Sequence, residues 1–222
     1  MPDPAPLEVR LIPVTPFQQN CSLMWDKRTK EAVLVDPGGE PKKLLGAIDQ
    51  LGLKLTAIWL THGHLDHAGG AAAVQRATGV DIVGPHKGDD WLLEAIPDQA
   101  RQYGIPELES CAPTRWLKDG DTVSLGETVF NVSHCPGHTP GHVVIHSAAH
   151  KIAFVGDVLF KGSIGRTDFP RGNHQDLLDS IVDKLWPLGD DMRFVPGHGQ
   201  GSTFGWERKT NPFVSDLALG RA

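Results

Sequence analysis

Short apolar segments recur along the chain, and most are bounded by Gly, Pro or Asp. Many are rich in β-branched residues, which is typical of β-strands. Longer segments repeat apolar residues at helical spacing and predict amphipathic helices. The predicted strands are Val9–Val14, Ser22–Trp25, Ala32–Val35, Ala57–Leu60, Asp81–Val83, Val129–Val132, Val143–His146, Ile152–Val155 and Arg193–Val195, and the predicted helices are Pro41–Leu51, His67–Thr78, Asp89–Tyr103 and His174–Leu185.

Strands and helices are mixed along the whole chain. The early strands follow one another closely, as in hairpins, and the later ones alternate with helices. This order predicts an α/β or α+β fold in which helices cover sheets. The chain contains no repeat, low-complexity segment or clear linker, so we expect one domain over residues 1–222. Asn173 is a plausible N-cap for the last predicted helix.

Composition excludes several classes of protein. Hydrophobic residues make up 40% and charged residues 22%, so the chain can form a core. The formal net charge is −6, and the basic residues are scattered among acids. Neither nucleic acid nor a membrane is therefore expected as a partner. The three cysteines are far apart, and the first residues do not resemble a signal peptide, which predicts a cytoplasmic protein.

The strongest chemical signal is Thr61-His-Gly-His-Leu-Asp-His67, which follows a predicted strand and precedes a predicted helix. In an extended segment, His62 and His64 face the same way. Asp66 and His67 lie where the chain turns into the helix, so the four side chains can address two neighbouring points. Imidazole nitrogen and carboxylate oxygen are ligands that zinc, iron and manganese accept. A single surface histidine carries no such meaning, but this cluster predicts a metal site.

Three further segments each place a candidate ligand at the end of a predicted strand. They are Cys135-Pro-Gly-His138, Phe154-Val-Gly-Asp157 and Val195-Pro-Gly-His198. Functional sites on sheet scaffolds commonly lie at such positions. Each segment alone is a weak signal, but together with the first motif they are specific.

These motifs resemble the metallo-β-lactamase superfamily in order and approximate spacing, over essentially the whole chain. Within it, the sequence is similar to the small glyoxalase II-like proteins, the group that includes bacterial YcbL. Supporting stretches include Val35-Asp-Pro-Gly-Gly39 and Gly165-Arg-Thr-Asp-Phe169. The resemblance implies a four-layered αβ/βα sandwich, with metals at one edge of two packed sheets.

The resemblance also implies a ligand set and a reaction. It assigns His62, His64 and His138 to one divalent metal (Zn, Fe or Mn), and Asp66, His67 and His198 to a second, with Asp157 bridging both. A hydroxide between the two cations would attack a thioester such as S-D-lactoylglutathione, with Asp66 and Asp157 as catalytic residues. A thiolate leaves without a strong general acid because thiols have a pKa of about 8.5. We therefore expect a hydrolase acting on a small-molecule thioester.

Substrate contacts are less constrained by the sequence. Lys161, Arg166 and Arg171 follow Asp157 and could bind an anionic glutathione conjugate, or they could be solvated loop charges. His134 and His142 could support the ligands or could simply pack. Too few residues follow His198 for the helical domain that holds glutathione in full-length glyoxalase II. The thiol carrier, the metal identity and the oligomeric state stay open.

Two other functions fit part of this pattern. A persulfide dioxygenase of the same superfamily would hold one iron with the residues matching His62, His138 and Asp157, and the stretch Gly165–Phe169 resembles that group too. A non-catalytic metal-binding protein would lack one or more ligands, and none is missing here. A nuclease would need a larger basic surface than this acidic chain has.

Overall fold

The computed structural model describes residues 6–105 and 107–221. Its first sheet has five strands in the order β1-β2-β3-β4-β5. β1 to β3 pair antiparallel, whereas β3, β4 and β5 pair parallel. These strands are β1 (Leu7–Val14), β2 (Gln19–Asp26), β3 (Glu31–Val35), β4 (Lys54–Trp59) and β5 (Asp81–Val83).

The second sheet has six strands in the order β13-β12-β9-β8-β7-β6, and β10 and β11 form a separate short hairpin. Only the β9–β12 pair is parallel among the pairs described in this sheet. The strands are β6 (Thr122–Leu125), β7 (Thr128–His134), β8 (Val143–Ser147), β9 (Ile152–Gly156), β12 (Arg193–Pro196) and β13 (Ser202–Thr203), and the hairpin is β10 (Leu159–Phe160) with β11 (Ser163–Ile164).

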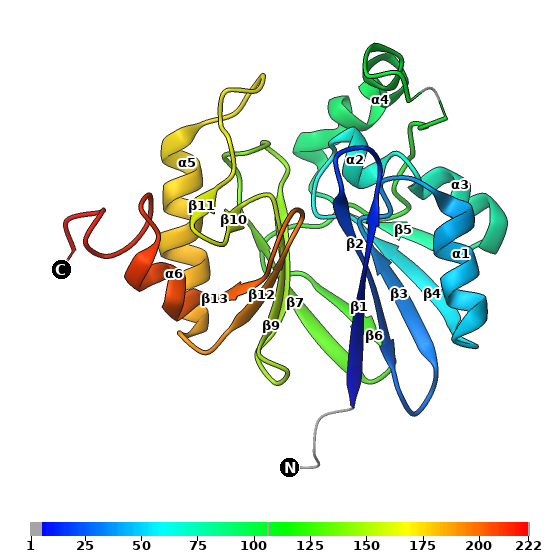
Figure 1. The fold of residues 1–222 in the computed structure, drawn as a ribbon, viewed down its shortest axis with the longest axis horizontal. Helices are drawn as coiled ribbons and strands as arrows, with labels where there is room; N and C mark the ends of the chain where they lie inside the picture. The colour runs from blue at the N-terminus through cyan, green and yellow to red at the C-terminus, as the bar shows by residue number, and fades with distance from the viewer. Residues whose placement is uncertain (1–5, 106, 222) are drawn as a thin grey trace.

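Helices cover the outer faces of both sheets (Figure 1). Those on the side of the first sheet are α1 (Pro41–Gln50), α2 (Leu65–Ala68), α3 (Ala71–Thr78), η1 (Lys87–Asp89) and α4 (Asp90–Gln102). Those on the side of the second are α5 (His174–Asp179), η2 (Ser180–Leu185), η3 (Trp186–Leu188) and α6 (Phe204–Thr210). In the part of the chain that the structure describes, every helix is too short or too polar to span a bilayer.

Three hydrophobic clusters hold these layers together. One lies between the first sheet and its helices, and a second lies between the second sheet and its helices. The third joins the inner faces of the two sheets, where the rings of Trp59 and Phe130 meet at 5.2 Å. The four-layered αβ/βα sandwich is therefore confirmed. The shared inner cluster also supports one domain, which stays a prediction.

All nine predicted strands overlap observed strands, and Asn173 is confirmed as an N-cap because its side chain accepts hydrogen bonds from Gln175 N and Asp176 N. The helix predicted over His67–Thr78 is wrong. Two helices, α2 and α3, occupy this segment and are separated by Gly69 and Gly70. A Cβ on Gly70 would lie 2.6 Å from the carbonyl oxygen of Pro37, so the loop after β3 can pack against the break. Asp66 and His67 lie in α2, before this break.

Sequence patterns also missed several short elements. They are β6, β10, β11, β13 and α6. Strands of two residues are too short to show an alternating pattern, and α6 is only seven residues long. Such elements depend on tertiary packing more than on local periodicity.

Candidate metal centre

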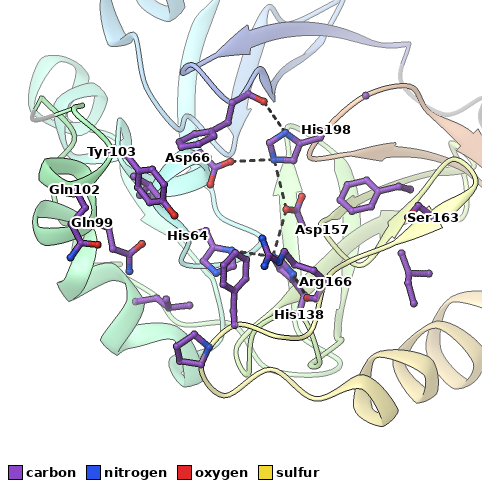
Figure 2. Close-up of a pocket in the computed structure, with 18 of the residues that line it drawn as sticks. His64, Asp66, Gln99, Gln102, Tyr103, His138, Asp157, Ser163, Arg166 and His198 are labelled. Carbon is purple, nitrogen blue, oxygen red and sulfur yellow. Dashed lines mark hydrogen bonds and ion pairs between the residues drawn. The ribbon is translucent and has the colours of Figure 1, made fainter. Parts of the chain in front are cut away.

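Four loops meet at one edge of the two sheets and bring the seven predicted ligands together. His62, His64, Asp66 and His67 follow β4, and His138 follows β7. Asp157 follows β9, and His198 follows β12. Figure 2 shows His64, Asp66, His138, Asp157 and His198 turned toward a common centre.

The first group of ligands is a cluster of three imidazoles. His62 Nε2 and His138 Nε2 each lie 3.0 Å from His64 Nδ1. Tetrahedral zinc with Zn–N bonds of 2.0–2.1 Å would separate its nitrogens by about 3.3 Å, close to this spacing. Burial lowers the pKa of His64 to about 3 and that of His62 well below its usual value. The rings are therefore neutral, as metal ligands must be.

The second group contains Asp66, His67 and His198. His198 Nε2 lies 3.2 Å from Asp66 Oδ2, and His67 Nε2 lies 3.9 Å from the same oxygen. One ligand atom from each residue falls within 4.8 Å of the others, as it does in the first group. Two separate clusters, each able to hold a cation, thus lie side by side.

Asp157 lies between these clusters. Its Oδ2 is 3.5 Å from His138 Nε2 in the first cluster and 3.7 Å from His198 Nε2 in the second. Burial acts to raise the pKa of Asp157, but the nearby His67, His138 and His198 outweigh burial and hold the pKa well below its usual value. The carboxylate is ionised and has an oxygen facing both clusters.

Unpaired buried atoms indicate that the site is built for cations. His67 Nε2 and Asp157 Oδ1 are buried, 3.4 Å apart, and have no hydrogen-bond partner in the described part of the chain. Burial acts to lower the pKa of His67, but the carboxylates of Asp157 and Asp66 outweigh it and raise the pKa well above its usual value. The carboxylates thus attract positive charge at a point where a divalent cation would supply it.

Asp36, to which the sequence analysis gave no role, orients a ligand of the second cluster. Its Oδ2 lies 2.9 Å from His67 Nδ1 and accepts a hydrogen bond from Thr61 Oγ1 at 2.6 Å. Its Oδ1 accepts a bond from Thr61 N at 2.7 Å. The carboxylate fixes the proton of His67 on Nδ1, which leaves Nε2 to face the cluster. The stretch Val35–Gly39 contains Asp36, but the sequence alone does not show its partner His67, which is 31 residues away.

Asp89 is a second residue that the sequence analysis missed. Its buried carboxylate accepts hydrogen bonds from Gly63 N at 2.9 Å, Thr139 Oγ1 at 2.7 Å and Gly141 N at 2.6 Å. Gly63 separates His62 from His64, and Thr139 follows His138. Asp89 therefore joins two ligand-bearing loops to the start of α4.

His142 contacts the ligands of the first cluster. Its ring stacks on that of His62 at 4.6 Å, and its Nε2 accepts a hydrogen bond from Asp157 N at 3.0 Å. A supporting role is thus favoured for His142. His134 Nε2 instead lies 2.9 Å from the carbonyl oxygen of Pro140, and its ring is tilted against that of His86 at 4.2 Å, outside both clusters.

Comparisons with known proteins agree with this geometry. The sequence pattern described as the metallo-beta-lactamase superfamily matches residues 14–198. The chain belongs to this superfamily. It is 46% identical over 210 residues to a protein of Haemophilus influenzae named hydroxyacylglutathione hydrolase GloC, covering 94% of this chain and 99% of the relative. The superfamily and this relative identify the chain as an enzyme, a metallo-hydrolase.

Two solved structures of the same superfamily are also similar. The crystal structure of BLEG-1 B3 metallo-beta-lactamase is 35% identical in sequence and has a TM-score of 0.86. The match covers 93% of this chain and 99% of that chain. The crystal structure of TTHA1623 in a di-iron-bound form is 38% identical in sequence and has a TM-score of 0.84. The match covers 93% of this chain and 100% of that chain. The second of these structures holds two irons.

A cavity of about 820 Å³ opens over the two clusters of candidate ligands. Lys161 and Arg166 line it, but Arg171 is not among its described lining residues and lies instead over the ring of Trp91 at 4.4 Å. Arg166 makes two hydrogen bonds to Asp168, whereas Lys161 Nζ bonds the neutral Gln200 at 3.1 Å and no acidic group among the described residues. Of the two predicted substrate contacts that line the cavity, Lys161 is thus the one whose positive charge could pair with an anionic substrate group.

The opposite side of the cavity is formed by α4 and by Phe17, which the sequence analysis had not connected with the site. Trp91, Gln99, Gln102 and Tyr103 line the cavity from this helix and its end. Their spacing predicts one helical face, but nothing local indicates that this face covers the two clusters of candidate ligands. That placement requires the tertiary structure.

Proposed function

We propose that this metallo-hydrolase holds two divalent cations. His62, His64 and His138 would bind one, Asp66, His67 and His198 would bind the other, and Asp157 would bridge them. Zinc, iron and manganese all accept this mixture of imidazole and carboxylate ligands. The observation that carries the proposal is the position of Asp157 Oδ2, at 3.5 Å from one cluster and 3.7 Å from the other.

We propose further that the reaction is thioester hydrolysis, with S-D-lactoylglutathione or a related acyl-thiol as substrate. The 46% identity to a protein named hydroxyacylglutathione hydrolase supports this choice. The complete second cluster favours it over a dioxygenase with one iron, which would leave Asp66, His67 and His198 without a function. The cytoplasmic location stays a prediction from the sequence.

The protein's own residues would orient the reacting groups. Bound divalent cations would acidify a water molecule and stabilise the charge that develops on the thioester oxygen. His138 Nδ1 lies 2.8 Å from the carbonyl oxygen of Arg166, which keeps the proton on that nitrogen and leaves Nε2 for the cluster. Asp36 does the same for His67. Because a thiolate is a good leaving group, the site needs no separate general acid.

One experiment separates these functions. The metal content of protein purified without chelator would be measured together with two activities, the loss of S-D-lactoylglutathione and O₂ uptake with glutathione persulfide. We expect two metals per chain and thioester cleavage. A single iron with O₂ consumption would contradict the proposal and support the dioxygenase.

Matched variants test the ligand assignment. Asp157→Ala should lose metal and lower activity at least a thousandfold, because it removes the bridging carboxylate. Asp176→Ala, at an exposed position on α5, is the control and should keep both. Full metal content and full activity in Asp157→Ala would contradict the assignment.

A further inference from the structure

The cavity is much larger than the acyl group of the proposed substrate. Its volume of about 820 Å³ lies in the range that holds a drug-sized ligand. A hydroxyacyl group placed over the metal clusters would fill only a small part of this space. The remaining volume must accommodate the thiol part of the substrate, so its walls determine which thiol is accepted.

The wall formed by α4 presents polar groups that have no partner. Gln99, Gln102 and Tyr103 recur at positions i, i+3 and i+4, so they share one face of the helix. All three line the cavity, Gln99 half-buried and the other two exposed, and their side-chain polar atoms make no hydrogen bond in the described part of the chain, so they face the solvent of the cavity. Figure 2 shows them together on one side of the site, across from His138, Asp157 and Ser163.

This wall is fixed relative to the metal clusters at both ends. At its start, Asp89 binds the loops that carry the first cluster. At its end, the ring of Tyr103 meets that of Phe17 edge-on at 5.4 Å. The carbonyl oxygen of Phe17 in turn lies 3.2 Å from His198 Nδ1. The helix that carries Gln99 and Gln102 is therefore fixed beside the two clusters of candidate ligands.

The chemistry of the wall indicates what it binds. A glutamine amide offers both donors and an acceptor, so it matches the N–H and C=O groups of a peptide bond. Charge contributes less, since the described lining of the cavity has two Lys or Arg side chains, and Asp168 already neutralises Arg166, which leaves Lys161 for a carboxylate. An amide-containing thiol with few charges fits these walls better than a polyanionic one.

We propose that Gln99 and Gln102 form the subsite that binds the amide groups of the substrate's thiol, with Tyr103 and Phe17 packing against its chain. This proposal rests on the proposed thioester hydrolysis. It specifies that the thiol part of the substrate is peptide-like and contains amide groups. The loss of two neutral hydrogen bonds corresponds to roughly a tenfold fall in kcat/KM.

The test compares two lactoyl thioesters on the metal-loaded enzyme. One is the thioester of glutathione, which has two peptide bonds, and the other is that of 2-mercaptoethanol, which has none. The double variant Gln99→Ala/Gln102→Ala should lower kcat/KM about tenfold for the glutathione thioester and less than twofold for the mercaptoethanol thioester. The control is Asp98→Ala/Arg101→Ala, which changes two residues at the same spacing on the exposed side of α4 and should leave both values within twofold.

Each outcome decides the question. An equal loss on both substrates, or no loss on either, would overturn the subsite while leaving thioester hydrolysis in place. Hydrolysis of neither substrate by the unmodified enzyme would overturn the proposed function itself. Circular dichroism of the double variant checks that α4 is retained, which is expected because alanine favours helix.

Discussion

Replacing Asp89 tests whether one buried carboxylate organises the candidate metal centre. Its side chain accepts three hydrogen bonds, from Gly63 N, Thr139 Oγ1 and Gly141 N, and it is fully buried. Burial raises its pKa to about 6 even with these three donors present. The protein therefore keeps a carboxylate where an uncharged residue would be easier to bury. We expect the reason to be that its hydrogen bonds position the loops that carry the candidate ligands.

The expected magnitudes follow from the contacts. Asp89→Asn retains the shape, but its amide nitrogen must face the N–H of either Gly63 or Gly141, so one buried donor is left unpaired. That loss costs about 1–3 kcal/mol of unfolding free energy. Asp89→Ala removes both acceptor oxygens, and with them all three hydrogen bonds, and opens a cavity, so we expect a loss of about 3–6 kcal/mol of unfolding free energy. Because the freed loops carry His62, His64 and His138, metal affinity should fall about 10–100-fold in Asp89→Asn.

Two measurements check this prediction. Denaturant unfolding of the metal-free protein gives the stability change, and competition with a chelator gives the metal affinity. Asp90→Asn is the control, because its partner Lys87 is exposed and such surface pairs contribute about 0–1 kcal/mol. If Asp89→Asn kept its metal affinity within twofold, Asp89 would be a structural residue without influence on the centre.

Three further predictions concern packing, metal and substrate. Gly70→Ala should destabilise the protein by about 1–3 kcal/mol because its Cβ would lie 2.6 Å from Pro37 O, whereas Gly46→Ala in α1 meets nothing within 4 Å and should stabilise by about 0.5–1 kcal/mol; equal denaturation midpoints for the two variants would refute this. Removing metal with a chelator should lower Tm by about 10 °C, since a ligand at 1,000 times its Kd adds about 4 kcal/mol and a chain of this size shifts about 2–4 °C per kcal/mol; an unchanged calorimetric scan would argue against a bound metal in the purified protein. Lys161→Ala should raise the KM for the glutathione thioester several-fold and leave kcat within twofold, while Lys209→Ala on α6 should change neither; steady-state kinetics with an unchanged KM for Lys161→Ala would remove it from the substrate site.

Local patterns in the sequence determined most of the scaffold and the candidate ligands. β-Branched segments bounded by glycine and proline marked the nine predicted strands, because strand burial leaves a signal in neighbouring residues. The four candidate ligands between His62 and His67 could be identified together since they lie within six consecutive positions. His138, Asp157 and His198 were identifiable because each follows a strand through a short turn containing glycine, a spacing that resembles the superfamily.

Contacts between distant residues could be decided only by the tertiary structure. Asp89 carries no motif of its own, and the motif around Asp36 does not show its partner. Their roles arise when the chain brings Gly63 and His67 within hydrogen-bond distance. Arg171 follows Asp157 closely in sequence, yet it stacks on Trp91, because the path of a loop depends on the side chains against which it packs. The wall of α4 likewise gains its place over the clusters from packing between layers. Periodicity reports which face of a helix is buried or exposed, but not what lies opposite that face.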